Sequence, residues 1–183
     1  MKTRKRLFAE STEKNRLADA DPAFCTANRL VTDQNGKTGS AFSLGKYPAR
    51  HNACEAIALH NAKVLTGRAS TLSDAIEAVV KGGAVPGRGF FGTLPWKLGK
   101  VLKREGVAAK RVKFRELAAD GVYIVSFWNK KPWKNGLHTV AAVQKGGSFT
   151  LFNWGGTTVW TEEERGKMKR RYVCGYRLCT PAA

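Results

Sequence analysis

The sequence predicts a single α+β domain, with helices in its front half and an antiparallel sheet in its back half. Two patterns indicate this class. Between residues 52 and 105, apolar side chains recur at the three- and four-residue intervals of helices. From residue 107 to 179, short runs rich in Val, Tyr, Phe, Trp and Thr alternate with turns. A chain of 183 residues suffices for one domain with a sizeable core and is too short for two ordinary ones.

The first 20 residues are polar, charged and weakly patterned, so we expect a basic arm of low order outside a domain that spans residues 21–183. The chain begins like the charged end of a signal peptide, but Glu10, Glu13 and Lys14 interrupt what would be the apolar region. No secretory signal is therefore predicted. Residues 24–47 carry turn signals and short apolar pieces, which favour irregular structure or a small hairpin.

The first predicted helix covers residues 52–65. Asn52 and Glu55 have the spacing of a capping box, which places Cys54 in the first turn, and Gly67 is positioned to end the helix. The apolar positions that define its packed face are Cys54, Ala58, Ala62 and Leu65.

Two further helices are predicted before the sheet. One covers residues 72–81, capped by Thr71 with Asp74 three positions later, and ends at Gly82. The other covers residues 94–105, with Pro95 in its first turn.

Six strands are predicted in the back half. Their approximate ranges are 107–114, 122–128, 137–144, 148–154, 157–160 and 172–179. Gly146 and Gly147 separate the third and fourth of these, as in a loop that joins antiparallel strands.

The composition restricts the functional class. The chain has no apolar stretch long enough to span a bilayer, so we expect no membrane span. Four cysteines without a Cys-x-x-Cys pair or a Cys/His zinc spacing predict a cytoplasmic protein with no metal or other cofactor. The excess of 32 Lys and Arg over 14 Asp and Glu, a formal charge of +18, attracts polyanions. No nucleic-acid motif accompanies it, so solvated basic faces are the simpler interpretation.

Cys54 is the candidate nucleophile. A helix N-terminus and a nearby imidazolium both lower the pKa of a thiol, and the predicted helix supplies the first of these. Of the three histidines, His51 precedes the helix and His60 points to another side of it, whereas His138 opens an apolar strand that could hold it rigidly. Asn153 ends the next strand, where an antiparallel hairpin returns it beside His138 and its side-chain carbonyl could orient the ring.

These pieces resemble the papain-like cysteine peptidases, and within them the bacterial group that includes the double-glycine leader peptidases. The resemblance lies in Asn52-Ala-Cys-Glu-Ala-Ile-Ala-Leu-His-Asn-Ala62, Gly89-Phe-Phe-Gly-Thr-Leu-Pro95, Gly136-Leu-His-Thr-Val-Ala141 and Phe152-Asn-Trp154. It implies a papain-like fold, with the nucleophile helix packed on the sheet, and a triad of Cys54, His138 and Asn153.

The sequence departs from this family before the nucleophile, where papain-like enzymes usually place a Gln that helps to hold the oxyanion. Here Pro48 stands six residues before Cys54, and no Gln lies between the two. Asn52 is a candidate replacement, with the Cys54 backbone N–H as its partner, but capping the helix would compete with that role. Substrate-cleft candidates are Trp128, Trp154 and Gly92, with Trp133 also near the proposed site.

The preferred function is hydrolysis of a peptide or amide bond in a peptide or protein substrate, and the basic surface would favour an acidic one. Deamidation and transamidation use the same groups and stay open. The alternative is a catalytically idle domain that binds nucleic acid or an acidic protein through its basic surface. Taken singly, each residue is better explained by a structural role: Cys54 as a small buried hydrophobe, His138 as a satisfied strand residue and Asn153 as a turn residue. Their order and their positions on these elements together favour catalysis.

Overall fold

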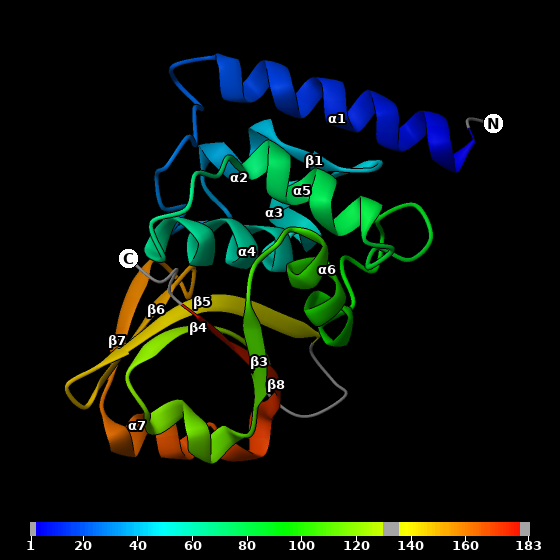
Figure 1. Ribbon diagram of the computed structural model, residues 1–183. Helices are drawn as coiled ribbons and strands as arrows, with labels where there is room; N and C mark the ends of the chain where they lie inside the picture. The colour runs from blue at the N-terminus through cyan, green and yellow to red at the C-terminus, as the bar shows by residue number, and fades with distance from the viewer. Residues whose placement is uncertain (1–2, 130–135, 180–183) are drawn as a thin grey trace.

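The computed structural model describes residues 3–129 and 136–179 and has a helical layer stacked on one face of a six-stranded sheet (Figure 1). Helix α4 (Cys54–Leu65) lies between helix α5 (Leu72–Lys81) and the sheet. The prediction of an α+β domain, with the helix of Cys54 packed on an antiparallel sheet, is confirmed.

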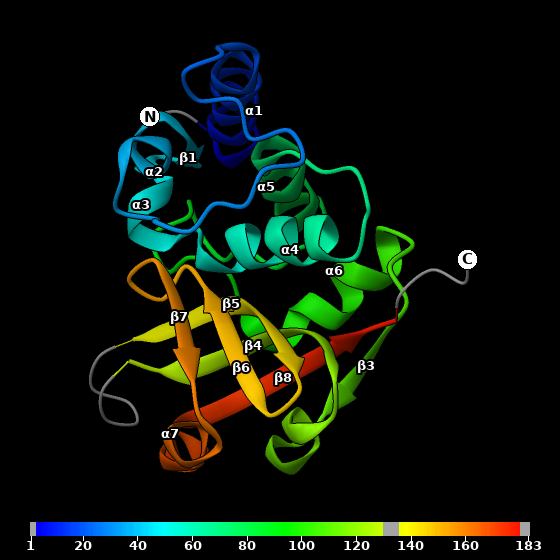
Figure 2. The same ribbon diagram turned by 90° about the vertical axis from the view of Figure 1, so that its left-hand side faces the viewer.

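All neighbouring strands of the sheet are antiparallel, in the order β3-β8-β4-β5-β6-β7 (Figure 2). Their bounds are β3 Ala109–Val112, β4 Gly121–Trp128, β5 Leu137–Lys145, β6 Ser148–Phe152, β7 Thr157–Trp160 and β8 Tyr172–Leu178. Gly146 and Gly147 join β5 to β6 with φ angles of 55° and 84°, values that glycine adopts without steric cost. This hairpin returns the chain toward the start of β5, where the site lies.

The strand alternation divides the core between the two faces of the sheet. Ile124 and Ala141 belong to the cluster under α4 and α5, whereas their neighbours Val125 and Val140 belong to the cluster on the opposite face. The opposite cluster contains several aromatic side chains and Leu117 from a short 3-10 segment, η2 (Phe114–Ala118).

The central helices follow the sequence expectations closely. Helix α5 has the expected bounds, with the Thr71 side chain accepting from the Asp74 backbone N–H. The helix expected over residues 94–105 is a 3-10 turn, η1 (Pro95–Lys97), followed by α6 (Leu98–Arg104). The helix expected over 52–65 is broken at Ala53 into α3 (Ala49–Asn52) and α4.

The N-terminal segment is not the expected arm of low order. Residues Arg4–Ala20 form helix α1, which lies across the top of the helical layer (Figure 1). Ser11 and Asn15 are buried on its inner face, where Ser11 Oγ and Asn15 Nδ2 donate to the Ser43 carbonyl and Asn15 Oδ1 accepts from the Ser43 N–H. The helix is held largely by polar contacts, so apolar periodicity did not reveal it.

Two smaller features complete the chain. Residues 24–47 are mostly irregular, and after helix α2 (Lys37–Ala41) a small hairpin pairs β1 (Ser43–Leu44) with β2 (Tyr47–Pro48). Helix α7 (Glu162–Lys167) and the 3-10 segment η3 (Lys169–Arg171) were not expected, although Thr161 and Glu164 form a reciprocal capping box that the sequence displays. Within residues 3–129 and 136–179, no helix has the length and apolar character needed to cross a bilayer.

Candidate functional site

Cys54 is the first residue of α4 and lies at a pocket where the helical layer meets the start of β5. Gln34, Cys54, His138 and Asn153 all line this pocket. The structure therefore brings together the three residues that the sequence nominated, from a helix and two ends of one hairpin. Cys54 is only 7% exposed, so access to its sulfur is narrow.

The start of α4 differs from the expected capping box. The N-cap position is Ala53, with no side-chain cap, and Asn52 instead ends the preceding helix. The Asn52 Nδ2 donates to the Gly89 carbonyl, and its Oδ1 is buried without a hydrogen-bond partner among the described residues. Asn52 thus neither caps α4 nor directs its amide donor toward the pocket, because that donor bonds the loop at Gly89.

His138 is held by the backbone of Asn153. The His138 Nε2 lies 2.6 Å from the Asn153 carbonyl oxygen. Because a carbonyl oxygen can only accept, this Nε2 carries the proton, which leaves the lone pair of a neutral ring on Nδ1. The sequence had assigned this orienting contact to the side chain of Asn153, and the structure assigns it to the main chain.

The Asn153 side chain has a different partner, Gln34. Asn153 Oδ1 accepts from the Gln34 backbone N–H at 2.8 Å, and Asn153 Nδ2 donates to Gln34 Oε1 at 3.1 Å. Asn153 also has a φ of 72°, a left-handed conformation that Asn tolerates better than most residues. This conformation and the pairing with Gln34 together fix the carbonyl that holds His138.

A buried carboxylic acid lies directly beside the thiol. Cys54 Sγ donates to Glu55 Oε2 at 3.2 Å, and Thr139 Oγ1 donates to Glu55 Oε1 at 3.1 Å. Thr139 Oγ1 also lies 2.8 Å from Ser126 Oγ on the adjacent strand. A chain of polar side chains therefore runs from Cys54 into the sheet, on the face toward α4.

The resting site is not a preformed thiolate. Burial, and next the charge of Glu55, raise the pKa of Cys54 well above its ordinary value, although a backbone hydrogen bond from Thr139 opposes this. Burial lowers the pKa of His138, against the opposing effect of the Asn153 carbonyl. Both shifts favour a neutral thiol and a neutral imidazole, contrary to the lowered thiol pKa that the helix N-terminus alone predicted.

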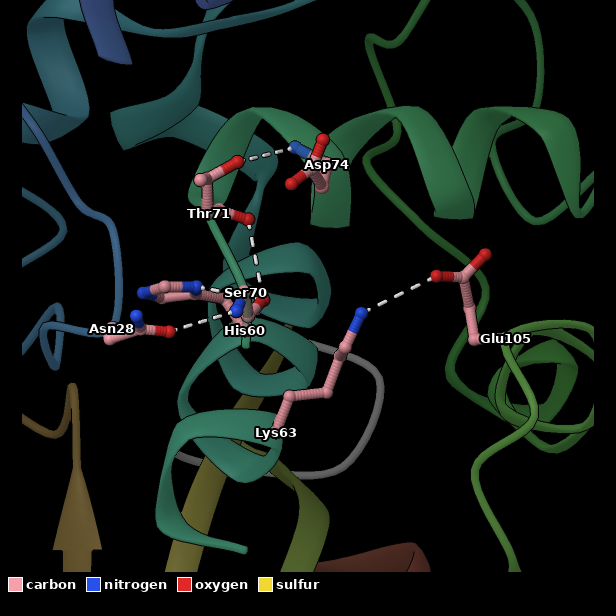
Figure 3. Close-up of polar contacts among 7 residues, drawn as sticks. All are labelled: Asn28, His60, Lys63, Ser70, Thr71, Asp74 and Glu105. Atoms are coloured by element: carbon pink, nitrogen blue, oxygen red, sulfur yellow. Dashed lines mark hydrogen bonds and ion pairs between the residues drawn. The ribbon is translucent and has the colours of Figure 1, made fainter. Parts of the chain in front are cut away.

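The other two histidines lie differently. His60 is buried in α4, with Nδ1 3.1 Å from Ser70 Oγ and Nε2 2.7 Å from the Arg29 carbonyl oxygen. Figure 3 shows its ring beside Ser70, which lies just before the N-cap of α5. His60 therefore links α4 to neighbouring segments. His51 lines the pocket but is an exposed residue of α3.

The cleft candidates separate into two groups. Trp154 lines the pocket, and its ring lies 5.5 Å from that of His138. Trp128 and Gly92 are not among the described residues that line it. The Trp128 carbonyl accepts a hydrogen bond from Arg171, and Gly92 packs against Asn52. Trp133 lies outside the described residues.

Sequence reasoning missed Gln34 and Glu55. Gln34 stands 20 positions before Cys54, in an irregular segment where no periodic pattern assigns a neighbour. Glu55 was treated as half of a capping box, and its place inside an otherwise apolar helix, Cys-Glu-Ala-Ile-Ala-Leu, was the available signal. In the described parts of the chain, no group of three or more His, Cys, Asp or Glu side chains has the geometry to hold a metal ion.

Comparison with known proteins gives little further information. No protein-family model matches the chain, and no curated protein matches it. Among solved structures, the chain is similar to the Pseudomonas avirulence protein AvrPphB, with 12% identity and a TM-score of 0.31 over 92% of this chain and 88% of that one. At this level of similarity the match assigns neither a site nor an activity to this chain.

Proposed function

We propose that this protein is a cysteine hydrolase that cleaves a peptide or amide bond, with Cys54 as nucleophile and His138 as general base. The observation that carries the proposal is their convergence at one pocket, which Cys54 lines from the first turn of α4 and His138 from the start of β5. A thiol and a rigidly held imidazole that share one pocket are the groups that acyl transfer requires.

The tautomer of His138 supports the direction of proton transfer. With Nε2 donating to the Asn153 carbonyl, the free lone pair on Nδ1 is the acceptor for the Cys54 proton. The thiolate then attacks the substrate carbonyl carbon, and the protonated Nδ1 gives its proton to the leaving amine. A water molecule hydrolyses the resulting thioester and regenerates the thiol. The Asn153 carbonyl stabilises the imidazolium that forms between these steps.

The oxyanion donor in this mechanism is the backbone N–H of Cys54. The first N–H groups of an α-helix have no acceptor within the helix, and Ala53 provides no side-chain cap for them. Asn52 and Gln34 are weaker choices, since Asn52 donates to Gly89 and Gln34 Nε2 donates to the Ala49 and Arg50 carbonyls.

The basic composition favours acidic segments in the substrate. A formal charge of +18 speeds the encounter with negatively charged peptides, and this attraction weakens as salt screens it. We expect cleavage of acidic peptides to fall with salt more steeply than cleavage of neutral peptides. Equal salt dependence for acidic and neutral peptides would show that charge does not contribute to substrate specificity.

The proposal is tested by incubating the protein with a mixed-sequence peptide library and identifying products by mass spectrometry. New termini that form with wild type, and disappear with Cys54→Ala and with His138→Ala, are the expected result. A mass change without chain cleavage would identify deamidation or transamidation by the same residues. Products that persist in both variants would overturn the assignment of the site.

A further inference from the structure

The mechanism above does not use the buried acid that contacts its nucleophile. Glu55 is 3% exposed, follows Cys54 directly in α4, and places both carboxylate oxygens against hydroxyl or thiol donors. The Cys54 thiol is one of those donors, at 3.2 Å. Among the hydrogen bonds of residues 3–129 and 136–179, none joins the thiol to His138, and the thiol donates to a side-chain acid in the resting structure.

The surroundings of Glu55 provide no compensating cation. In residues 3–129 and 136–179, none of the ion pairs includes Glu55. The titratable groups near it are Cys54 on its own helix and Cys174 on β8, both of which its charge disfavours as thiolates. From β5 and the loop before α6, Thr139 and Thr93 contribute only neutral hydrogen-bond donors.

Both protonation states of Glu55 are therefore accessible near neutral pH. Burial raises its pKa to about 7, against hydrogen bonds from Cys54, Thr139 and Thr93 that lower it. An ordinary exposed glutamate would be ionised throughout this range.

We infer that Glu55 is a positioning residue whose ionised carboxylate holds the Cys54 thiol protonated, and whose protonation releases the thiol to His138. The inference rests on the proposed role of Cys54 as nucleophile. It adds that the resting site is restrained by an acid within the nucleophile helix, and that acidification through neutrality removes the restraint.

The proton balance of the two states explains the restraint. With Glu55 ionised, removing the Cys54 proton would leave two adjacent negative charges in a buried site. When Glu55 has taken a proton from solvent, its hydroxyl can donate to sulfur. The Cys54 proton then passes to His138 Nδ1, giving a thiolate and an imidazolium beside a neutral acid.

The test measures the rate of Cys54 alkylation by iodoacetamide across the neutral pH range, with the labelled peptide identified by mass spectrometry. Glu55→Gln removes the charge and keeps the shape, so we expect alkylation at neutral pH to accelerate about tenfold, equivalent to one pKa unit of thiol acidity. Glu13→Gln is the matched control, because it makes the same charge change at an exposed position of α1. An unchanged or slower rate in a folded Glu55→Gln protein overturns the inference.

A second variant keeps the test decisive if Glu55→Gln fails to fold. Thr139→Val removes the donor to Glu55 Oε1, which shifts the acid toward its neutral form and should accelerate alkylation near neutral pH. No acceleration in folded Thr139→Val would contradict the inference. Infrared titration of the Glu55 carboxyl group, assigned by the loss of its band in Glu55→Ala, should also give a midpoint near neutrality. An ordinary acidic midpoint would contradict the inference.

Alkylation does not require turnover, so the two proposals fail separately. If peptide cleavage is absent but Glu55→Gln still accelerates alkylation, the hydrolase proposal fails and the restraint on Cys54 stands. If cleavage depends on Cys54 and His138 but Glu55→Gln leaves alkylation unchanged, the hydrolase proposal stands and the role of Glu55 fails.

Discussion

Asn153 and Gln34 are joined by two reciprocal hydrogen bonds, at 2.8 Å and 3.1 Å, across 119 positions of the chain. Each residue also fixes one wall of the pocket, since Asn153 holds His138 through its carbonyl and Gln34 bonds the carbonyls at the start of α3. The pair therefore connects the helical layer to the sheet at the candidate site.

This pairing predicts that substitutions of the two residues are non-additive. Asn153→Gly keeps the left-handed backbone and the carbonyl that holds His138, but loses both bonds to Gln34. Gln34→Ala keeps the backbone N–H that donates to Asn153, but loses the bond from Asn153 Nδ2 and its own bonds to the carbonyls of α3. We expect each variant to lower the free energy of unfolding by about 1–3 kcal/mol, and the double variant to lose less than the sum of the two. Urea titrations of the four proteins measure this. Fully additive losses would mean that the two side chains act independently.

The Glu55 environment predicts a pH dependence of stability. Because its folded pKa is raised from 4.5 to about 7, the folded state binds more protons than the unfolded state in that window, and the free energy of unfolding falls as pH rises through it. The loss is about 3 kcal/mol when complete. Glu55→Gln has no titrating carboxyl group at this position and lacks that pH-dependent loss. Its free energy of unfolding relative to wild type should therefore increase from acidic to mildly alkaline pH.

The buried histidines affect the pH dependence of stability in the opposite direction to Glu55. Their effect cancels when wild type is compared with Glu55→Gln. The pKa values of His60 and His138 are lowered by burial, so both residues make stability rise with pH up to the unfolded histidine pKa. These contributions are common to wild type and Glu55→Gln. A difference between the two proteins that stays constant with pH would show that Glu55 titrates normally.

Helix α1 should be an integral part of the fold. Asn15 is fully buried and makes hydrogen bonds in both directions with the Ser43 main chain. Asn15→Ala leaves the Ser43 N–H without this acceptor and removes one of the two donors to the Ser43 carbonyl, and we expect it to lower the free energy of unfolding by about 1–3 kcal/mol. Glu13→Ala on the exposed face is the control and should change it by less than about 0.5 kcal/mol. Equally small losses in Asn15→Ala and Glu13→Ala would indicate that α1 does not pack stably on the rest of the protein.

Gly39 should be irreplaceable for steric reasons. A Cβ added there would lie 1.7 Å from the Gln34 carbonyl oxygen, and backbone cannot yield by that much without displacing Gln34. Gly39→Ala should therefore destabilise the protein by several kcal/mol, above about 3, and disturb the pocket. Gly166→Ala in α7 meets no atom within 4 Å and should be neutral or stabilising. Thermal unfolding of both variants makes the comparison, and similar melting temperatures would contradict it.

The sequence predicted the elements that are held by apolar burial. The apolar repeat of α5 and the β-rich runs identified the layers because one face of each packs on the core. It did not predict α1 or the pairing of Gln34 with Asn153, because these depend on polar contacts between segments far apart in the chain. Cys54 and His138 were proposed as site residues because their chemistry is rare, whereas Glu55 was overlooked because it has a plausible local role as a cap.

The most direct test of the central claim compares Cys54 alkylation rates at neutral pH in wild type, His138→Ala and His51→Ala. Both histidines line the pocket, but only His138 is oriented by a hydrogen bond to the Asn153 carbonyl. The Cys54–His138 pair predicts that His138→Ala slows alkylation at least tenfold, or about 1.4 kcal/mol, while His51→Ala changes it by less than about twofold. Equal rates in wild type and a folded His138→Ala protein would contradict the pairing of Cys54 with His138.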